Sequence, residues 1–199
     1  MIYAHRGIHN KFIPENSLIS FFKCKNKNIG IELDVRIIKT GEIVVFHDSN
    51  LKRMTGIDKK IEELELKELN EITLLNTKYK IPLLIDVLNL INNEVPILIE
   101  IKSKNKKIVK KLIKILNNYE NYKIQSFNKK ILNIYKKYHK VGLLSYKVNN
   151  DYDFLVMPNY LINDLTIKKI KTKLFIWNVK LQNIKKYKKY TDTFIVDYD

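Results

Sequence analysis

Short apolar runs alternate along the whole chain with amphipathic stretches that are rich in lysine. Runs of four to eight residues with many β-branched side chains predict strands. Nine such strands are predicted, at residues 2–6, 31–38, 43–48, 97–102, 123–127, 141–146, 154–158, 174–179 and 193–198. Helical spacing of apolar residues predicts helices at residues 17–27, 61–72, 106–117, 128–138, 163–171 and 182–190. The pair Asn16 and Ser17 offers an N-cap to the first of these helices, and we favour this role for Asn16.

The alternation of strands and helices predicts a parallel sheet that is wrapped by helices. Nine candidate strands fit a closed (β/α)₈ barrel better than an open sheet, and one of them must lie outside the barrel. Residues 36–42 leave no room for a helix between the second and third strands, but they can span roughly 23 Å. We therefore predict a single compact (β/α)₈ TIM barrel, distorted, with a helix missing between the second and third strands. A tight antiparallel hairpin at this point is the alternative.

No Gly/Pro/Ser-rich linker or internal repeat divides the 199 residues, so we expect one domain over residues 1–199. The segment of about 51–84 is the least strand-like and is predicted to be an insertion on one rim. A single cysteine, Cys24, excludes a disulfide scaffold and a cysteine-rich zinc site. The N-terminus shows no hydrophobic leader and no apolar run approaches 18 residues, so we expect a cytoplasmic protein without a membrane span.

The formal net charge is +16, from 37 basic and 21 acidic residues. Such a charge invites a nucleic-acid partner. However, only Arg6, Arg36 and Arg53 are arginines, and the lysines are spread over the second half rather than gathered in one arm. Arginine is the usual reader of base edges, so nucleic acid is an unlikely partner and solvated helix faces are favoured. Attraction to an anionic membrane surface stays open.

Charged residues occupy one face of two predicted strands. In IELDV, Glu32 and Asp34 point away from the three apolar residues, and in ILIEIK, Glu100 and Lys102 do the same. Three carboxylates and a lysine at one end of a barrel are costly to bury without a cation or a charged ligand. A site explains the pattern better than solvent-facing charges on two half-buried strands.

Two histidines, His5 and His47, lie at the ends of predicted strands. A single histidine at such a position is usually structural. Two of them, in a chain with only four histidines, are better candidates for an acid/base pair.

Five short motifs resemble those of the glycerophosphodiester phosphodiesterases, in order and spacing. They are AHRG (4–7), PENS (14–17), ELDV (32–35), VVFHD (44–48) and EIK (100–102). The resemblance holds from Ile2 to Lys102 and is weaker beyond that residue. Beyond Lys102 the sequence departs from the family at four positions. Asn178 and Lys180 replace the threonine and asparagine usual around the family tryptophan, here Trp177, and Val196 and Asp199 replace a threonine and a proline. These departures concern the substrate more than the chemistry.

The resemblance implies a metal-dependent phosphodiesterase of the phospholipase C-like superfamily. It implies that Glu32, Asp34 and Glu100 hold Mg²⁺ or Ca²⁺, in agreement with the preference of hard cations for carboxylate oxygens. It further implies that Arg6 and Lys102 bind the phosphate, and that His5 and His47 are general acid and base in an order the sequence does not decide. Asp48 is expected to orient His47 rather than bind metal. Trp177 resembles a pocket residue of the family, although a plain core role is equally compatible with its strand, where it is expected to share a face with Phe175 and Val179.

The leading hypothesis is hydrolysis of small-molecule glycerophosphodiesters to glycerol 3-phosphate and an alcohol. A second hypothesis keeps the site but changes the substrate to lysophospholipids or glycerol-phosphate polymers, which the basic surface would help the protein to reach. A third is a non-catalytic basic module that binds nucleic acid. The alcohol that leaves, the ion used and the oligomeric state are not determined by the sequence.

Overall fold

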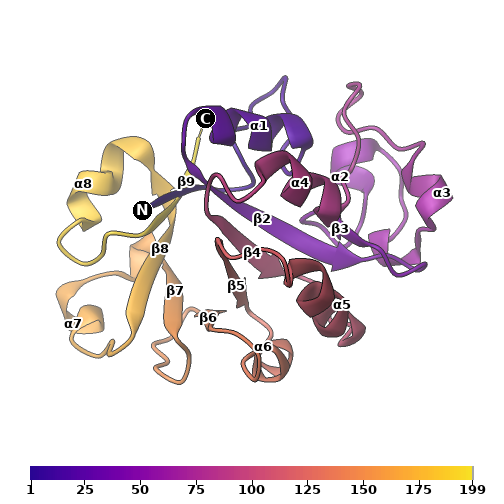
Figure 1. Ribbon diagram of the computed structural model, residues 1–199. Helices are drawn as coiled ribbons and strands as arrows, with labels where there is room; N and C mark the ends of the chain where they lie inside the picture. The colour runs from indigo at the N-terminus through magenta and orange to yellow at the C-terminus, as the bar shows by residue number, and fades with distance from the viewer. Residues whose placement is uncertain (199) are drawn as a thin grey trace.

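Nine strands pair into one sheet in the order β1-β9-β8-β7-β6-β5-β4-β2-β3, and an additional pairing of β1 with β2 closes it into a barrel (Figure 1). The structure is a computed structural model that describes residues 1–198, so Asp199 lies outside the described residues. The strands are β1 (Ile2–Ala4), β2 (Gly30–Ile37), β3 (Ile43–Val45), β4 (Ile97–Ile101), β5 (Tyr122–Ser126), β6 (Val141–Leu144), β7 (Phe154–Pro158), β8 (Lys173–Lys180) and β9 (Phe194–Asp197). All pairings except that of β3 are parallel, which confirms the predicted TIM barrel.

Strand β3 is the candidate that lies outside the barrel. It pairs antiparallel with the far end of β2, with Val35 opposite Val45 and Ile37 opposite Ile43. The prediction that no helix lies between the second and third strands is confirmed, since β3 follows β2 directly along the chain. The parallel direction expected for the third strand is wrong, and the hairpin alternative is correct. The reason lies in the turn, where Gly41 adopts a φ of 102° and the Ile38 N–H donates to the Glu42 carbonyl, so the chain reverses at once.

The helices fall into two groups by length: four have seven to ten residues and four have only four. They are α1 (Leu18–Asn26), α2 (Lys52–Thr55), α3 (Leu66–Leu69), α4 (Leu84–Ile91), α5 (Lys107–Leu116), α6 (Lys129–Tyr135), α7 (Asp164–Ile167) and α8 (Ile184–Tyr187). Three predicted helices are reduced: residues 61–72 hold a 3₁₀ turn and α3, residues 163–171 hold only α7, and residues 182–190 hold α8 after a 3₁₀ turn. In residues 145–153, all of them described, no helix separates β6 from β7. The predicted helical segments that are not helical in the structure are rich in lysine and contribute few apolar side chains to the barrel. Tertiary packing therefore does not stabilise longer helices there.

The barrel has two apolar layers. Its interior is filled by side chains such as Tyr3, Leu98, Phe154 and Phe175, and the rings of Phe154 and Phe175 stack with their centroids 4.4 Å apart. Its outer face packs against the long helices, with Leu112 of α5 fully buried there. The segment of about 51–84 carries a separate apolar cluster that packs over β3. No helix among residues 1–198 has both the length and the apolar character needed to cross a bilayer.

Candidate active site

Three carboxylates from the neighbouring strands β2 and β4 converge inside the barrel. Because side chains alternate along a strand, Ile31, Leu33 and Val35 belong to the outer apolar layer while Glu32 and Asp34 point into the barrel. Asp34 lies opposite Glu100 in the β2–β4 register. One ligand atom from each of Glu32, Asp34 and Glu100 lies within 4.8 Å of the others, and all three residues are buried. The structure thus brings together the predicted triad.

Burial decides the charge of this triad. Burial, reinforced by the neighbouring Asp34 charge, raises the pKa of Glu32 to about 8 and that of Glu100 to about 7. Burial also opposes ionisation of Asp34, but Lys102, His47 and Arg6 hold the pKa of Asp34 below its usual range. The protein alone therefore does not stabilise three negative charges here at neutral pH, and a cation between the carboxylates would.

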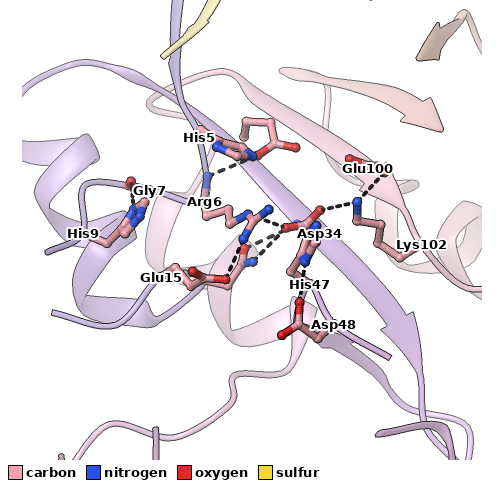
Figure 2. A network of polar contacts seen from close by, with 12 residues as sticks. His5, Arg6, Gly7, His9, Glu15, Asp34, His47, Asp48, Glu100 and Lys102 are labelled. Atoms are coloured by element: carbon pink, nitrogen blue, oxygen red, sulfur yellow. Dashed lines mark hydrogen bonds and ion pairs between the residues drawn. The ribbon is translucent and has the colours of Figure 1, made fainter. Parts of the chain in front are cut away.

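Two cations lie beside the carboxylates, as Figure 2 shows for Asp34 and Glu100. Lys102 Nζ lies 2.8 Å from Glu100 Oε1 and 3.6 Å from Asp34 Oδ1, and Arg6 Nε lies 3.5 Å from Asp34 Oδ2. Arg6 adopts a φ of 56°, which is uncommon for a residue with a side chain. Gly7 follows with a φ of 79°, and a Cβ there would lie 2.5 Å from Ser20 Oγ. This tight turn directly after β1 aims Arg6 into the barrel mouth.

Each predicted catalytic histidine is held by a carboxylate on its Nδ1 atom. His5 Nδ1 lies 2.6 Å from Asp197 Oδ1, and His47 Nδ1 lies 2.6 Å from Asp48 Oδ1. In both cases Nε2 is left for other partners. Burial lowers the pKa of His5, but the Asp197 bond and the Glu32 charge outweigh it, so the pKa is raised. For His47 burial prevails, aided by Lys102, and the pKa is lowered despite Asp34 and Asp48.

Three site residues were not predicted as such. Asn16 does not cap α1, because Ser17 is the N-cap and accepts a bond from the Ser20 N–H. Instead Asn16, with a φ of 52°, is buried and donates from Nδ2 to Asp34 Oδ2 at 2.9 Å. Gln125 donates to Glu32 Oε1 at 3.2 Å, and Asp197 holds His5. Gln125 could have been predicted from its inward position on its strand. Asp197 could have been predicted from the pairing of the last strand with the first.

Charged and aromatic side chains line one cavity of about 210 Å³. The charged and imidazole groups are both histidines, Arg6, Lys102, Glu32 and Glu100. Phe127, Tyr146 and Trp177, whose rings lie next to one another, form an aromatic wall of the same cavity. Trp177 meets Tyr146 edge to face, with ring centroids 6.2 Å apart. The structure thus brings every predicted site residue to one cavity, apart from Asp34, which lies behind it in contact with Arg6 and Lys102.

The strand that carries Trp177 departs from regular alternation. Asn178 adopts a φ of 60°, and the β8–β9 register shifts between Ile176 and Val179. Trp177 consequently packs with Phe175 against the barrel interior, whereas Val179 joins the outer apolar layer. The expectation that Val179 shares the face of Trp177 is wrong, because this bulge inserts one residue into the alternation.

Unpaired polar atoms concentrate in this site. Among residues 1–198, five buried side-chain nitrogen or oxygen atoms lack a hydrogen-bond partner: Arg6 Nε, Asp34 Oδ1, Gln125 Oε1, Trp177 Nε1 and the Tyr135 hydroxyl. All but Tyr135 belong to the site. Buried polar groups without partners are rare in folded proteins, so their clustering indicates the place of a polar, charged ligand.

Together, the parallel barrel and the carboxylate, imidazole and cationic groups at the carboxyl ends of its strands define a TIM-barrel protein with a site suited to a divalent cation and a phosphate. Residues 5–192 match the glycerophosphoryl diester phosphodiesterase family, and the chain belongs to this family.

Individual relatives agree with this assignment. The chain is 34% identical over 161 residues to a glycerophosphodiester phosphodiesterase of Caldanaerobacter subterraneus subsp. tengcongensis, which covers 72% of this chain and 66% of the relative. It is 34% identical over 111 residues to one of Bacillus altitudinis, with 52% and 45% covered. The chain therefore spans about half to two thirds of the length of these relatives. Its fold is similar to that of an Oleispira antarctica phosphodiesterase solved with the product sn-glycerol-3-phosphate, with a TM-score of 0.90 at 21% identity, over 100% of this chain and 93% of that one.

Proposed function

We propose that the protein is a metal-dependent phosphodiesterase that hydrolyses glycerophosphodiesters to glycerol 3-phosphate and an alcohol. The observation that carries the proposal is the convergence of Glu32, Asp34 and Glu100 within 4.8 Å of one another, beside two carboxylate-bound histidines. Family membership supports the reaction class, and the Oleispira relative, which was solved with sn-glycerol-3-phosphate, supports the product.

The carboxylate triad fits a hard divalent cation, Mg²⁺ or Ca²⁺. Asp34 Oδ1 has no hydrogen-bond partner among residues 1–198, and the pKa values of Glu32 and Glu100 are raised; both observations fit a site built around such an ion. When bound, the ion neutralises charge on the phosphodiester and lowers the pKa of a coordinated hydroxyl. Arg6 and Lys102 lie on either side of Asp34 and are placed to bind the non-bridging phosphate oxygens, Arg6 through its planar fork.

The two histidines supply acid/base catalysis. The neutral imidazole accepts a proton from the attacking hydroxyl, and the protonated imidazole donates one to the leaving alcohol. The pKa of His5 is raised and that of His47 is lowered, so the two imidazoles differ in their affinity for a proton, as an acid/base pair requires. Asp197 and Asp48 fix the Nδ1 side of each ring, so proton transfer falls to Nε2 in both.

The aromatic wall is proposed to hold the glycerol moiety. Trp177 is half-buried at the cavity, and its Nε1–H has no partner among residues 1–198. Its ring offers an apolar face to the glycerol carbons, and its N–H can donate to a glycerol hydroxyl.

The test is the release of glycerol 3-phosphate from glycerophosphocholine in the presence of Mg²⁺, Ca²⁺ or EDTA. We expect activity with an ion, none with EDTA, and a loss of about 10²–10⁴-fold for His47→Ala. His139→Ala is the matched control, since His139 is exposed and its ring hydrogen-bonds, among residues 1–198, only to the Tyr122 hydroxyl. Metal-independent activity, or equal activity of the two variants, would refute the mechanism.

A second candidate substrate is a lysophospholipid presented in an anionic membrane. Three large apolar or aromatic side chains favour it, because they are exposed just after the strands at the end of the barrel that holds the site. They are Phe127, Tyr146 and Tyr160, which are 41%, 55% and 63% exposed. The net charge of +16 would attract this surface to anionic lipid.

Salt separates the two substrates. Exposed charges are screened by added salt, so hydrolysis of lysophospholipid in anionic vesicles should fall steeply between low and moderate salt. Hydrolysis of soluble glycerophosphocholine should change little over the same range. Equal salt dependence for both substrates would exclude a membrane-docked substrate.

A further inference from the structure

Arg53 lies outside the catalytic groups, on the short helix α2, and contacts two carboxylates at once. Its Nη1 and Nη2 atoms donate to the two oxygens of Glu15 at 3.0 and 2.6 Å, and its Nε donates to Asp48 Oδ2 at 2.6 Å. All three contacts use the planar fork of the guanidinium, which a lysine does not possess. Glu15 and Asp48 belong to separate loops, one after β1 and the other after β3.

Each of these carboxylates also holds a residue of the site. Asp48 Oδ1 lies 2.6 Å from His47 Nδ1, and Glu15 Oε1 accepts a bond from Arg6 Nη1 at 2.9 Å. A continuous chain of contacts therefore runs from His47 through Asp48, Arg53 and Glu15 to Arg6, part of which is drawn in Figure 2. Glu15 lies 38 positions before Arg53 in the sequence, so this one side chain links the loop after β1 to the loop after β3.

The electrostatics favour ionised partners along this chain. Burial opposes ionisation of Asp48, but bonds from Arg53 and His47 hold the pKa of Asp48 at about 2. The pKa of Glu15 is likewise lowered, because bonds and charges of Arg53 and Arg6 outweigh its burial. Both carboxylates are thus acceptors only, so Asp48 fixes the His47 tautomer with its proton on Nδ1.

We propose that Arg53 is a positioning residue that aligns the acid/base histidine with the phosphate-binding arginine, by fixing Asp48 and Glu15 relative to each other. The inference rests on the proposed function, in which His47 and Arg6 act on the same phosphodiester. Without Arg53 the two loops lose their direct link, and small displacements at reacting groups are costly in rate.

The experiment compares Arg53→Met with Lys52→Met. Lys52 is the neighbouring cation on the same helix, but it pairs only with the exposed Asp58 at 3.1 Å. We expect kcat/KM to fall about a hundredfold for Arg53→Met and by about twofold or less for Lys52→Met. Arg53→Lys, which keeps the charge but cannot make the three contacts, should lose about tenfold. Equal activity of Arg53→Met and Lys52→Met would overturn the proposal.

A mutant cycle separates positioning from a general loss of stability. If Arg53 acts through Glu15 and Asp48, Arg53→Met should cost about twofold or less in the Glu15→Gln/Asp48→Asn background. A full hundredfold loss in that background, or a loss that merely follows the unfolding temperature, would contradict the proposal.

Nitrogen NMR of the His47 ring gives a readout that is independent of activity. We expect the proton on Nδ1 in the wild type and in Lys52→Met, and a mixture of tautomers in Arg53→Met. An unchanged tautomer in Arg53→Met would refute the positioning of His47. A wild type that hydrolyses no glycerophosphodiester would refute the proposed function, while the NMR comparison would still test the contact chain.

Discussion

The two halves of the barrel differ in both construction and content. The first half, through α5, carries α1, α4 and α5, of nine, eight and ten residues, and contributes the three carboxylates, both histidines, Arg6 and Lys102. The second half, from β6 onward, has only α7 and α8, of four residues each, and contributes Trp177 and Asp197 to the site. The charged residues of the site thus lie on the half with the longer helices. The other half supplies Trp177, which lines the cavity, and Asp197, which bonds to His5.

The largest difference between the halves should appear in carboxylate substitutions. Asp34→Asn removes a charge from the predicted metal site, and activity should fall by at least about 10³-fold together with divalent-cation binding, measured by calorimetry. Asp164→Asn in α7 makes the same chemical change on an exposed residue and should leave both quantities unchanged. Retained cation binding in Asp34→Asn would show that the triad is not the metal site.

Packing should differ in the same direction. Leu112 of α5 is fully buried, so Leu112→Ala should lower the free energy of unfolding by about 2–5 kcal/mol. Ile167 of α7 is only partly buried against its cluster, so Ile167→Ala should cost about 1 kcal/mol. Denaturant titration measures both, and similar losses would show that the two halves are packed equally well.

The metal-free protein should lose stability as the pH rises. Glu32 and Glu100 have pKa values of about 8 and about 7 in the folded state, above the unfolded value of 4.5. The folded state therefore binds more protons than the unfolded state between about pH 4.5 and 8, and the free energy of unfolding falls across this range.

Added Mg²⁺ or Ca²⁺ should restore this stability, by about 2.7 kcal/mol at a hundredfold excess over Kd, and more strongly at pH 8 than at pH 5. The unfolding temperature measured over this pH range with and without the ion checks both statements. An unfolding temperature that rises with pH in EDTA would mean that ionisation of Glu32 and Glu100 does not destabilise the folded state.

The smallest effect should come from the aromatic wall. Trp177→Ala should raise KM for glycerophosphocholine about tenfold, equivalent to roughly 1.4 kcal/mol of binding, with little change in cation affinity. Tyr138→Ala removes an aromatic ring that is 60% exposed and does not line the cavity, and it should leave KM unchanged. A fall in kcat without a change in KM would assign Trp177 to the chemistry rather than to substrate binding.

Local pattern predicted much of the barrel. Strand alternation puts Glu32 and Asp34 on the face of β2 opposite to that of Leu33, so the sequence predicted that these two carboxylates share a face. The β2–β4 register then places Asp34 beside Glu100. The direction of β3 was not predictable from segment length alone, since residues 36–42 fit both a return and a reversal.

Contacts between distant segments account for the missed site residues. Asp197 reaches His5 only because β9 pairs with β1, and Asn16 turns toward Asp34 because its backbone takes a left-handed conformation that releases the cap to Ser17. The face of Val179 depended on a bulge at Asn178, where a single residue changes the alternation. Such features arise from closure of the sheet rather than from any short pattern.

The partnership of His5 with Asp197 joins residues separated by 192 positions, at the seam where the first and last strands meet. During synthesis, both imidazoles and all three acidic groups leave the ribosome well before the aspartate that steadies His5. His5 therefore gains its carboxylate partner only after β9 has paired with β1, and a nascent fragment that ends before β9 holds both imidazoles and all three carboxylates without Asp197.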